Sequence, residues 1–104
     1  MSRGPDIGTA LIRAIGRHAG DAGCAIEIVS ADWDHWASAT FAGARHQITL
    51  AAEACPAITG WLGGLAEAEF DISGHLVADL AVTAVRRSGG RIEAALEVLT
   101  VEVR

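Results

Sequence analysis

Apolar residues recur at helical spacing from residue 6 to residue 19. One side of such a helix carries Ile7, Leu11, Ala14, Ile15 and His18. Asp6 has a side chain suited to the N-cap, and Gly20 suits the left-handed position that follows many helix ends. The spacing therefore predicts a first helix over residues 6–19.

A second helical pattern covers residues 56–66. Its apolar stripe consists of Ile58, Trp61, Leu62 and Leu65. Pro56 is favourable at the first helical position, where no backbone N–H is needed. Gly60, Gly63 and Gly64 each weaken the helix by about 1 kcal/mol relative to alanine. We interpret these glycines as a sign that the helix packs very closely against a sheet or a partner helix.

Apolar and polar residues alternate between the two helical stretches. Residues 24–30 alternate in this way, which predicts a strand. Within residues 33–53, the pair Gly43-Ala44 suits a two-residue hairpin turn. With the turn at this pair, Asp34 faces Glu53 across the hairpin, and one face of both strands is apolar.

A second hairpin is predicted after residue 75, around a three-residue loop from Ser88 to Gly90. This loop pairs Leu80 with Val98 and Val82 with Leu96 on one face. Beyond Val98 the apolar residues are Leu99, Val101 and Val103. In a regular strand these side chains would point to the opposite face from Leu96 and Val98. Because an extra residue would return them to the same face, we expect a β-bulge near Val98–Leu99.

The order of elements is helix, strand, hairpin, helix, hairpin. If residues 24–41 form one bent strand, the order becomes helix–hairpin twice. Residues 1–104 are short enough for a single domain. We predict an α+β fold of two layers, in which two helices pack on one face of an antiparallel sheet of four to five strands.

Composition restricts the partners and the compartment. The chain has no Lys and no Asn, which we interpret as the codon bias of a GC-rich bacterial genome. Its net charge is −5, and the only arginine cluster is Arg86, Arg87 and Arg91. Nucleic-acid binding needs a larger basic patch, so we expect none.

We expect a cytoplasmic protein without membrane contact. The N-terminal residues contain no apolar signal-peptide core, and no apolar run reaches the roughly 18 residues that a membrane span requires. Cys24 and Cys55 form no C-x-x-C pair. We interpret them as reduced structural thiols in preference to a disulfide.

The stretch SADWDHWAS, residues 30–38, has the most candidate chemistry. In a strand, Trp33 and His35 lie on the core face, and Asp34 and Trp36 lie on the outer face. Alternation therefore separates the groups that would ligate a metal, and only a loop could bring them together. We predict the start of a strand, with Asp32 in a turn, and neither a metal site nor a cofactor.

An acid–base site is the alternative. The predicted register brings Asp34 and Glu53 together, and facing carboxylates can raise one pKa. A small enzyme could then use Asp34, His35 or Glu53 between the sheet and the helices. The pair lies at the open end of the hairpin, where water solvates both groups, and no G-x-S-x-G or other catalytic motif occurs.

The outer face of the sheet is the leading candidate for function. Its predicted interface or ligand-binding residues are Trp36, Ser38, Thr40 and Thr49. The face carries few charges for a solvated surface, and apolar patches of this kind mark partner surfaces. We predict a self-associating binding or structural domain, most simply a homodimer through this face, and we assign no small-molecule ligand.

Overall fold

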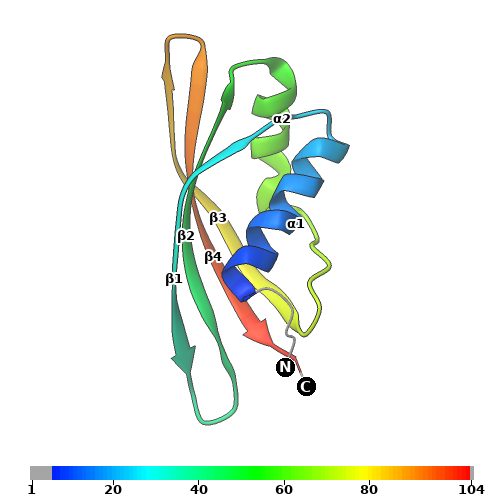
Figure 1. Cartoon of the computed structure of the whole chain (residues 1–104), viewed down its shortest axis with the longest axis vertical. Coiled ribbons are helices and arrows are strands. Elements are labelled where there is room, and N and C mark those ends of the chain that lie inside the picture. Colours follow the sequence, from blue (N-terminus) through cyan, green and yellow to red (C-terminus); the bar gives the residue numbers. More distant parts are fainter. Residues whose placement is uncertain (1–5, 104) are drawn as a thin grey trace.

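The computed structural model describes residues 6–103. Its elements are α1 (Ile7–Asp21), β1 (Glu27–Ala37), β2 (Ala42–Glu53), α2 (Pro56–Gly64), the short 3₁₀ helix η1 (Leu65–Glu67), β3 (His75–Ser88) and β4 (Arg91–Glu102). The strands form one antiparallel sheet in the order β1-β2-β4-β3. Both helices lie on one face of it (Figure 1), which confirms the predicted two-layer α+β fold.

Helix α1 begins as its sequence predicts. The Asp6 carboxylate accepts a hydrogen bond from the Thr9 backbone N–H at 2.7 Å, and this bond lowers the pKa of Asp6. The end predicted at Gly20 is wrong, because the helix continues to Asp21. The left-handed residue is Gly23, with φ of 80°.

Helix α2 begins at Pro56 and buries the predicted apolar stripe. The interpretation of its three glycines is wrong. A Cβ added at Gly60, Gly63 or Gly64 would meet no atom within 4 Å, so these positions face open space. No close approach requires a glycine at any of them.

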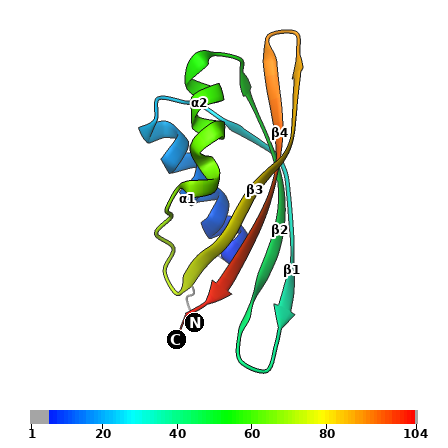
Figure 2. The same cartoon turned by 180° about the vertical axis from the view of Figure 1, so that it is seen from behind.

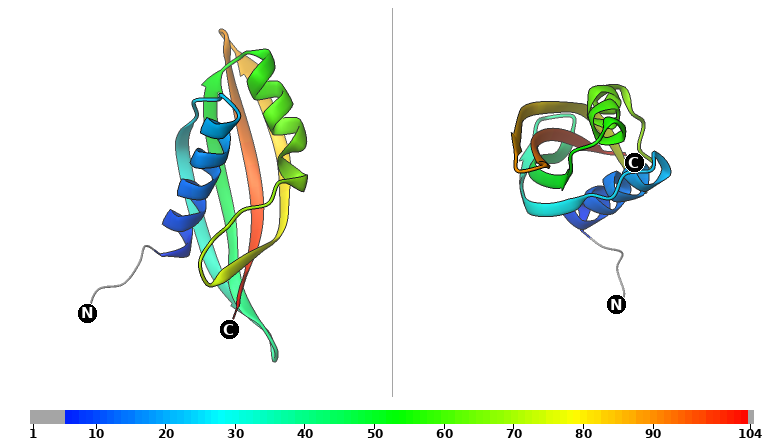
Figure 3. Two further views of the ribbon diagram at one scale, coloured as in Figure 1. Left: turned by 90° about the vertical axis from the view of Figure 1, so that its right-hand side faces the viewer. Right: turned by 90° about the horizontal axis from the view of Figure 1, so that it is seen from above.

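The two helices divide the sheet between them. Figure 3 shows α1 in front of the β1–β2 half and α2 in front of the β3–β4 half. Trp61 of α2 donates its indole N–H to His18 Nδ1 of α1 at 2.9 Å, which ties the helices together. Largest among the fully buried apolar side chains are Leu11, Ile15, Leu50, Ile58, Leu65, Ile92, Leu96 and Val98.

Both hairpin tips extend past the helices, the β3–β4 tip at one end and the β1–β2 tip at the other (Figure 2). The sheet is therefore longer than the layer that covers it. Within residues 6–103, no helix is long and apolar enough to cross a membrane.

The first hairpin turns earlier than predicted. Residues 27–37 form one strand with a bulge at Val29, and the chain reverses over residues 38–41. There the Ser38 N–H donates to the Phe41 carbonyl at 2.7 Å, and the Phe41 N–H donates to Ser38 Oγ at 3.1 Å. The serine side chain thus supplies the turn's hydrogen bonds, so no Gly-containing turn is needed.

Gly43, which was predicted to form the turn, lies inside β2, and close packing explains why this position is a glycine. A Cβ at this position would overlap the carbonyl oxygen of Thr100 and lie 2.9 Å from Cζ2 of Trp36. Glycine is required here by close packing in the sheet and not by a turn.

The predicted sides of residues 33–36 are nevertheless correct. The register that pairs Asp34 with Glu53 would place Trp36 opposite Ala51, and Trp36 lies opposite Gly43, eight positions away. Because side chains alternate with period two, an even shift changes the partners of these residues and leaves their faces unchanged. The same register would place Phe41 on the core face opposite His46, which is wrong, because Phe41 lies beside the turn and is 58% exposed. Trp33 and His35 lie on the helix-covered face, opposite His46 and Ala44, and Trp36 lies on the outer face.

The second hairpin has a two-residue turn, Gly89-Gly90, with φ of 57° and 80°. Positive φ at both positions is the requirement of a type I′ turn, so the predicted three-residue loop is one residue too long. A bulge at Thr83 in β3 then restores the predicted pairs of Leu80 with Val98 and Val82 with Leu96.

The bulge predicted near Val98–Leu99 lies on the neighbouring strand. The extra residue is Ala78 of β3, between the pairs of Val77 with Thr100 and Asp79 with Leu99. Strand β4 keeps its alternation throughout. Leu99, Val101 and Val103 therefore belong to the outer face and not to a shifted core face.

Candidate functional site

The stretch of residues 30–38 is mostly strand, as predicted, although Asp32 pairs with Gln47 and is not in a turn. Trp33 lies under the start of α1, where a Cβ on Gly8 would be 2.5 Å from Trp33 Nε1. His35 packs edge-on against Trp33, with 4.7 Å between ring centroids. Residues 6–103 contain no group of three or more His, Cys, Asp or Glu side chains placed to hold a metal ion.

A buried polar pair lies on the same face. His46 is 1% exposed and Thr100 is fully buried, and 2.9 Å separate His46 Nε2 from Thr100 Oγ1. The Thr100 hydroxyl also donates to the Ala44 carbonyl at 3.4 Å. Burial lowers the pKa of His46, and the nearby His75 lowers it further. These contacts give Nε2 of a buried core histidine a hydrogen-bond partner, as buried polar atoms require.

The predicted acid–base groups do not converge. Asp34 lies opposite Arg45, and Glu53 lies opposite Arg91 at the far end of β2. Arg45 and Glu53 are eight positions apart, which corresponds to about 27 Å of strand. The expected pairing of Asp34 with Glu53 is therefore wrong, and His35 points to the opposite face from Asp34.

The outer face carries an apolar row across all four strands. It runs from Trp36 to Gly43, Val101 and Leu76, which are successive partners in the sheet. The Trp36 ring covers Gly43, and its indole nitrogen is buried without a hydrogen-bond partner among residues 6–103. An aromatic side chain that shields a strand glycine is a recognised means of stabilising a sheet.

We call this region the apolar end of the outer face. It consists of Trp36, Phe41, Leu76, Leu99, Val101 and Val103. Leu76 is 61%, Phe41 is 58% and Val103 is 48% exposed. These three side chains and Val101 line a hollow of about 310 Å³. Clustered exposed apolar groups of this kind mark interaction surfaces.

The predicted interface residues are only partly on this face. Trp36 and Thr49 lie on it, whereas Ser38 and Thr40 belong to the turn at its edge. Sequence reasoning missed Phe41, Leu76 and the apolar residues of β4. In β4, alternate residues after Val98 are apolar, and this pattern indicated an apolar outer face. It was interpreted as the result of a β-bulge.

The other end of the outer face is charged. Arg86 contacts Glu93 at 3.0 Å, and Arg91 contacts Glu27 at 2.9 Å. Arg87, the third arginine of the cluster, donates to the Thr59 hydroxyl at 3.2 Å. Each arginine of this cluster is therefore engaged within the chain, and the outer face has two chemically distinct ends.

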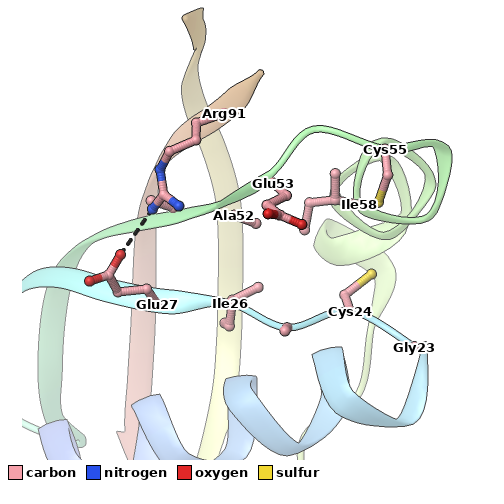
Figure 4. Close-up of a pocket in the computed structure, with 11 residues that line it drawn as sticks. Gly23, Cys24, Ile26, Glu27, Ala52, Glu53, Cys55, Ile58 and Arg91 are labelled. Atoms are coloured by element: carbon pink, nitrogen blue, oxygen red, sulfur yellow. Dashed lines mark hydrogen bonds and ion pairs between the residues drawn. The ribbon is translucent and has the colours of Figure 1, made fainter. Parts of the chain in front are cut away.

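A cleft of about 440 Å³ opens where β1 leaves β2 (Figure 4). The paired strands begin at Glu27 and Ala51, and the segments beyond that pair separate. Both cysteines line the cleft as free thiols, Cys24 buried and Cys55 exposed. The sequence places them far apart, and only the observed register brings Cys24 near Cys55.

Comparison with known proteins identifies no relative of this chain. No model of a known protein family matches the chain, and no curated protein matches it.

Proposed function

We propose that this chain is a self-associating binding or structural domain that forms a homodimer through the outer face of its sheet. The observation that carries the proposal is the apolar end, a cluster of exposed and half-buried apolar side chains on the sheet face opposite α1 and α2 (Figure 1). The helix-covered face has no comparable exposed cluster in the region under α1 and α2, where its apolar residues are buried.

A second copy of the chain is the occupant that we propose for this surface. Leu76 and Phe41 are exposed and line the hollow at the apolar end. A two-fold axis would bring the same patch of both copies together, so that the exposed apolar side chains of one copy meet those of the other.

The whole outer face has about the area of a standard interface, and the apolar end is part of it. Its strands contain 11 to 14 residues. Four strands of this length cover about 40 Å by about 19 Å, or roughly 750 Å², at ordinary strand dimensions. A standard stable interface buries about 800 Å² per partner. Contact centred on the apolar end also limits repulsion between two chains of net charge −5.

We also propose a cytoplasmic location. Both thiols are unpaired. Disulfides are rare in the reducing environment of the cytosol and frequent in secreted proteins of this size.

Sedimentation equilibrium at micromolar concentrations tests the dimer. We expect about twice the chain mass of 10.8 kDa. Leu76→Asp should weaken association at least tenfold, because it places a charge in the apolar contact. Val29→Asp is the matched control, since Val29 is 52% exposed on β1 outside the apolar end.

Circular dichroism should show that both variants are folded. A wild-type protein that remains monomeric at high concentration would contradict the proposal. Equal weakening by Leu76→Asp and Val29→Asp would also contradict it, because the contact would then not depend on the apolar end.

A further inference from the structure

We propose that Cys24 and Cys55 together form a two-thiolate binding site for one soft monovalent cation of the Cu(I) type. The chain has two cysteines, and both line the same cleft. In Figure 4 their sulfur atoms come from opposite walls of the cleft and point toward one another.

The separation of β1 from β2 creates this arrangement. Glu27 pairs with Ala51, and three further steps of the same register would place Cys24 opposite Ala54, the neighbour of Cys55. The two segments are instead held by other partners. The Cys24 N–H donates to Ala19 of α1, and the Ala54 N–H donates to Gly90 of the second hairpin, each at 2.8 Å.

These anchors favour a bridging ligand over a direct bond between the sulfurs. A disulfide requires the two Cα atoms to lie within about 7 Å. The two thiols are free in the structure. A bridging cation can bind both sulfurs and leave both walls in place.

The ligand set selects the class of cation. Thiolate sulfur is a soft ligand that favours Cu(I), and Cu(I) accepts two-coordinate binding. Structural zinc needs four ligands, and residues 6–103 contain no group of three or more suitable side chains. The Glu53 carboxylate also lines the cleft, but its oxygen atoms are hard ligands that a soft cation does not prefer.

The surroundings suit an ion held by two thiolates. Ile26, Ala52 and Ile58 supply apolar lining, and Cys24 is 7% exposed. On binding, each thiol loses its proton to solvent, two metal–sulfur bonds form, and no electron is transferred. The product carries one negative charge, and the one arginine that lines the cleft, Arg91, is paired with Glu27.

This site is separate from the proposed dimer surface. The cleft lies beside the pair of Glu53 with Arg91, and the apolar row contains the pair of Gly43 with Val101. Ten residues of strand separate them, about 34 Å. Failure of one proposal therefore leaves the other unaffected.

Anaerobic titration of the reduced full chain with Cu(I), in competition with a chromophoric Cu(I) chelator, tests the site. We expect one Cu(I) per chain and two protons released per ion. Cys24→Ser and Cys55→Ser should each weaken binding at least 100-fold. Cys24→Ala provides a second variant at the buried position in case serine destabilises the fold there.

A relocated thiol is the matched control. Cys55→Ser combined with Ala57→Cys keeps two cysteines but moves one to an exposed position of α2 that does not line the cleft. It should bind as weakly as Cys55→Ser alone, whereas Glu53→Gln should bind within about threefold of wild type. The proposal would be overturned if the wild type bound Cu(I) no more tightly than a single-serine variant. Tight binding by the relocated variant would overturn it as well.

Discussion

Leu96 and Leu99 lie three residues apart on β4 and meet opposite surroundings. Leu96 points toward the helices and is 1% exposed, whereas Leu99 points to the outer face, where no helix covers it. At its apolar end the outer face thus carries side chains as apolar as those of the core, yet only the helix-covered face is buried within the chain. An apolar residue in a strand is therefore buried only where a second layer of structure covers its face of the sheet.

Polar groups differ between the faces in the same way. On the covered face, His46 and Thr100 form a buried pair. On the outer face, Arg86 and Glu93 form an ion pair with side chains 80% and 41% exposed. A buried polar group left without its partner costs about 1–3 kcal/mol, whereas an exposed ion pair contributes little.

The largest expected difference comes from the two leucines. Leu96→Ala should reduce the free energy of unfolding by about 2–5 kcal/mol, because it leaves a cavity in the core. Leu99→Ala should cost less than about 1.5 kcal/mol in the monomer and act mainly on association. Urea denaturation at concentrations where the protein is monomeric measures both. Equal losses would show that the outer face is packed within the chain.

Gly43→Ala tests the one position where the outer face is tightly packed. The added Cβ would overlap the Thr100 carbonyl and crowd the Trp36 ring. We expect a loss of about 1–3 kcal/mol from this overpacking. Gly63→Ala, where the Cβ meets open space in a helix, should instead gain about 0.5–1 kcal/mol. A neutral Gly43→Ala variant would mean that Trp36 does not cover this glycine.

The buried histidine predicts a pH dependence. The folded state lowers the pKa of His46 from its ordinary value of 6.5. As the pH falls below that value, the unfolded chain binds a proton that the folded chain does not, so the free energy of unfolding decreases. The slope from this group is at most about 1.4 kcal/mol per pH unit, and it vanishes above the ordinary value.

Urea denaturation between about pH 5 and pH 7 measures this slope. His46→Gln keeps a hydrogen-bonding side chain and removes the titration, so its pH profile should be flatter than that of wild type. The other histidines are present in both proteins, so their contributions cancel in the difference except for the interaction of His75 with His46. Parallel profiles would argue against burial of a neutral His46.

The smallest effect is expected at the charged end of the outer face. Glu93→Gln removes the ion pair with Arg86 and should change the free energy of unfolding by less than about 0.5 kcal/mol, with less effect at high salt. Thermal denaturation in low and high salt measures this change. A loss above 1 kcal/mol would mean that this end is less solvated than its exposure indicates.

The sequence by itself determined the helices, the faces of residues 33–36 and the second turn, but not the face of the last apolar residues of β4. Helical spacing placed both apolar stripes, and Pro56 and Asp6 marked the helix starts. Period-two alternation assigned Trp33 and Trp36 to opposite faces even though their predicted partners were wrong. Gly89-Gly90 marked the second turn to within one residue. These features are local, because each depends on residues that are close together in the chain.

Only the tertiary structure decided the register, the bulges and the two candidate sites. Gly43 looks like a turn residue until the Thr100 carbonyl and the Trp36 ring are brought against it by strand pairing. The thiols of Cys24 and Cys55 share a cleft because β1 and β2 separate beyond Glu27. Such contacts join residues far apart in the chain, and alternation cannot distinguish registers that differ by an even number of residues.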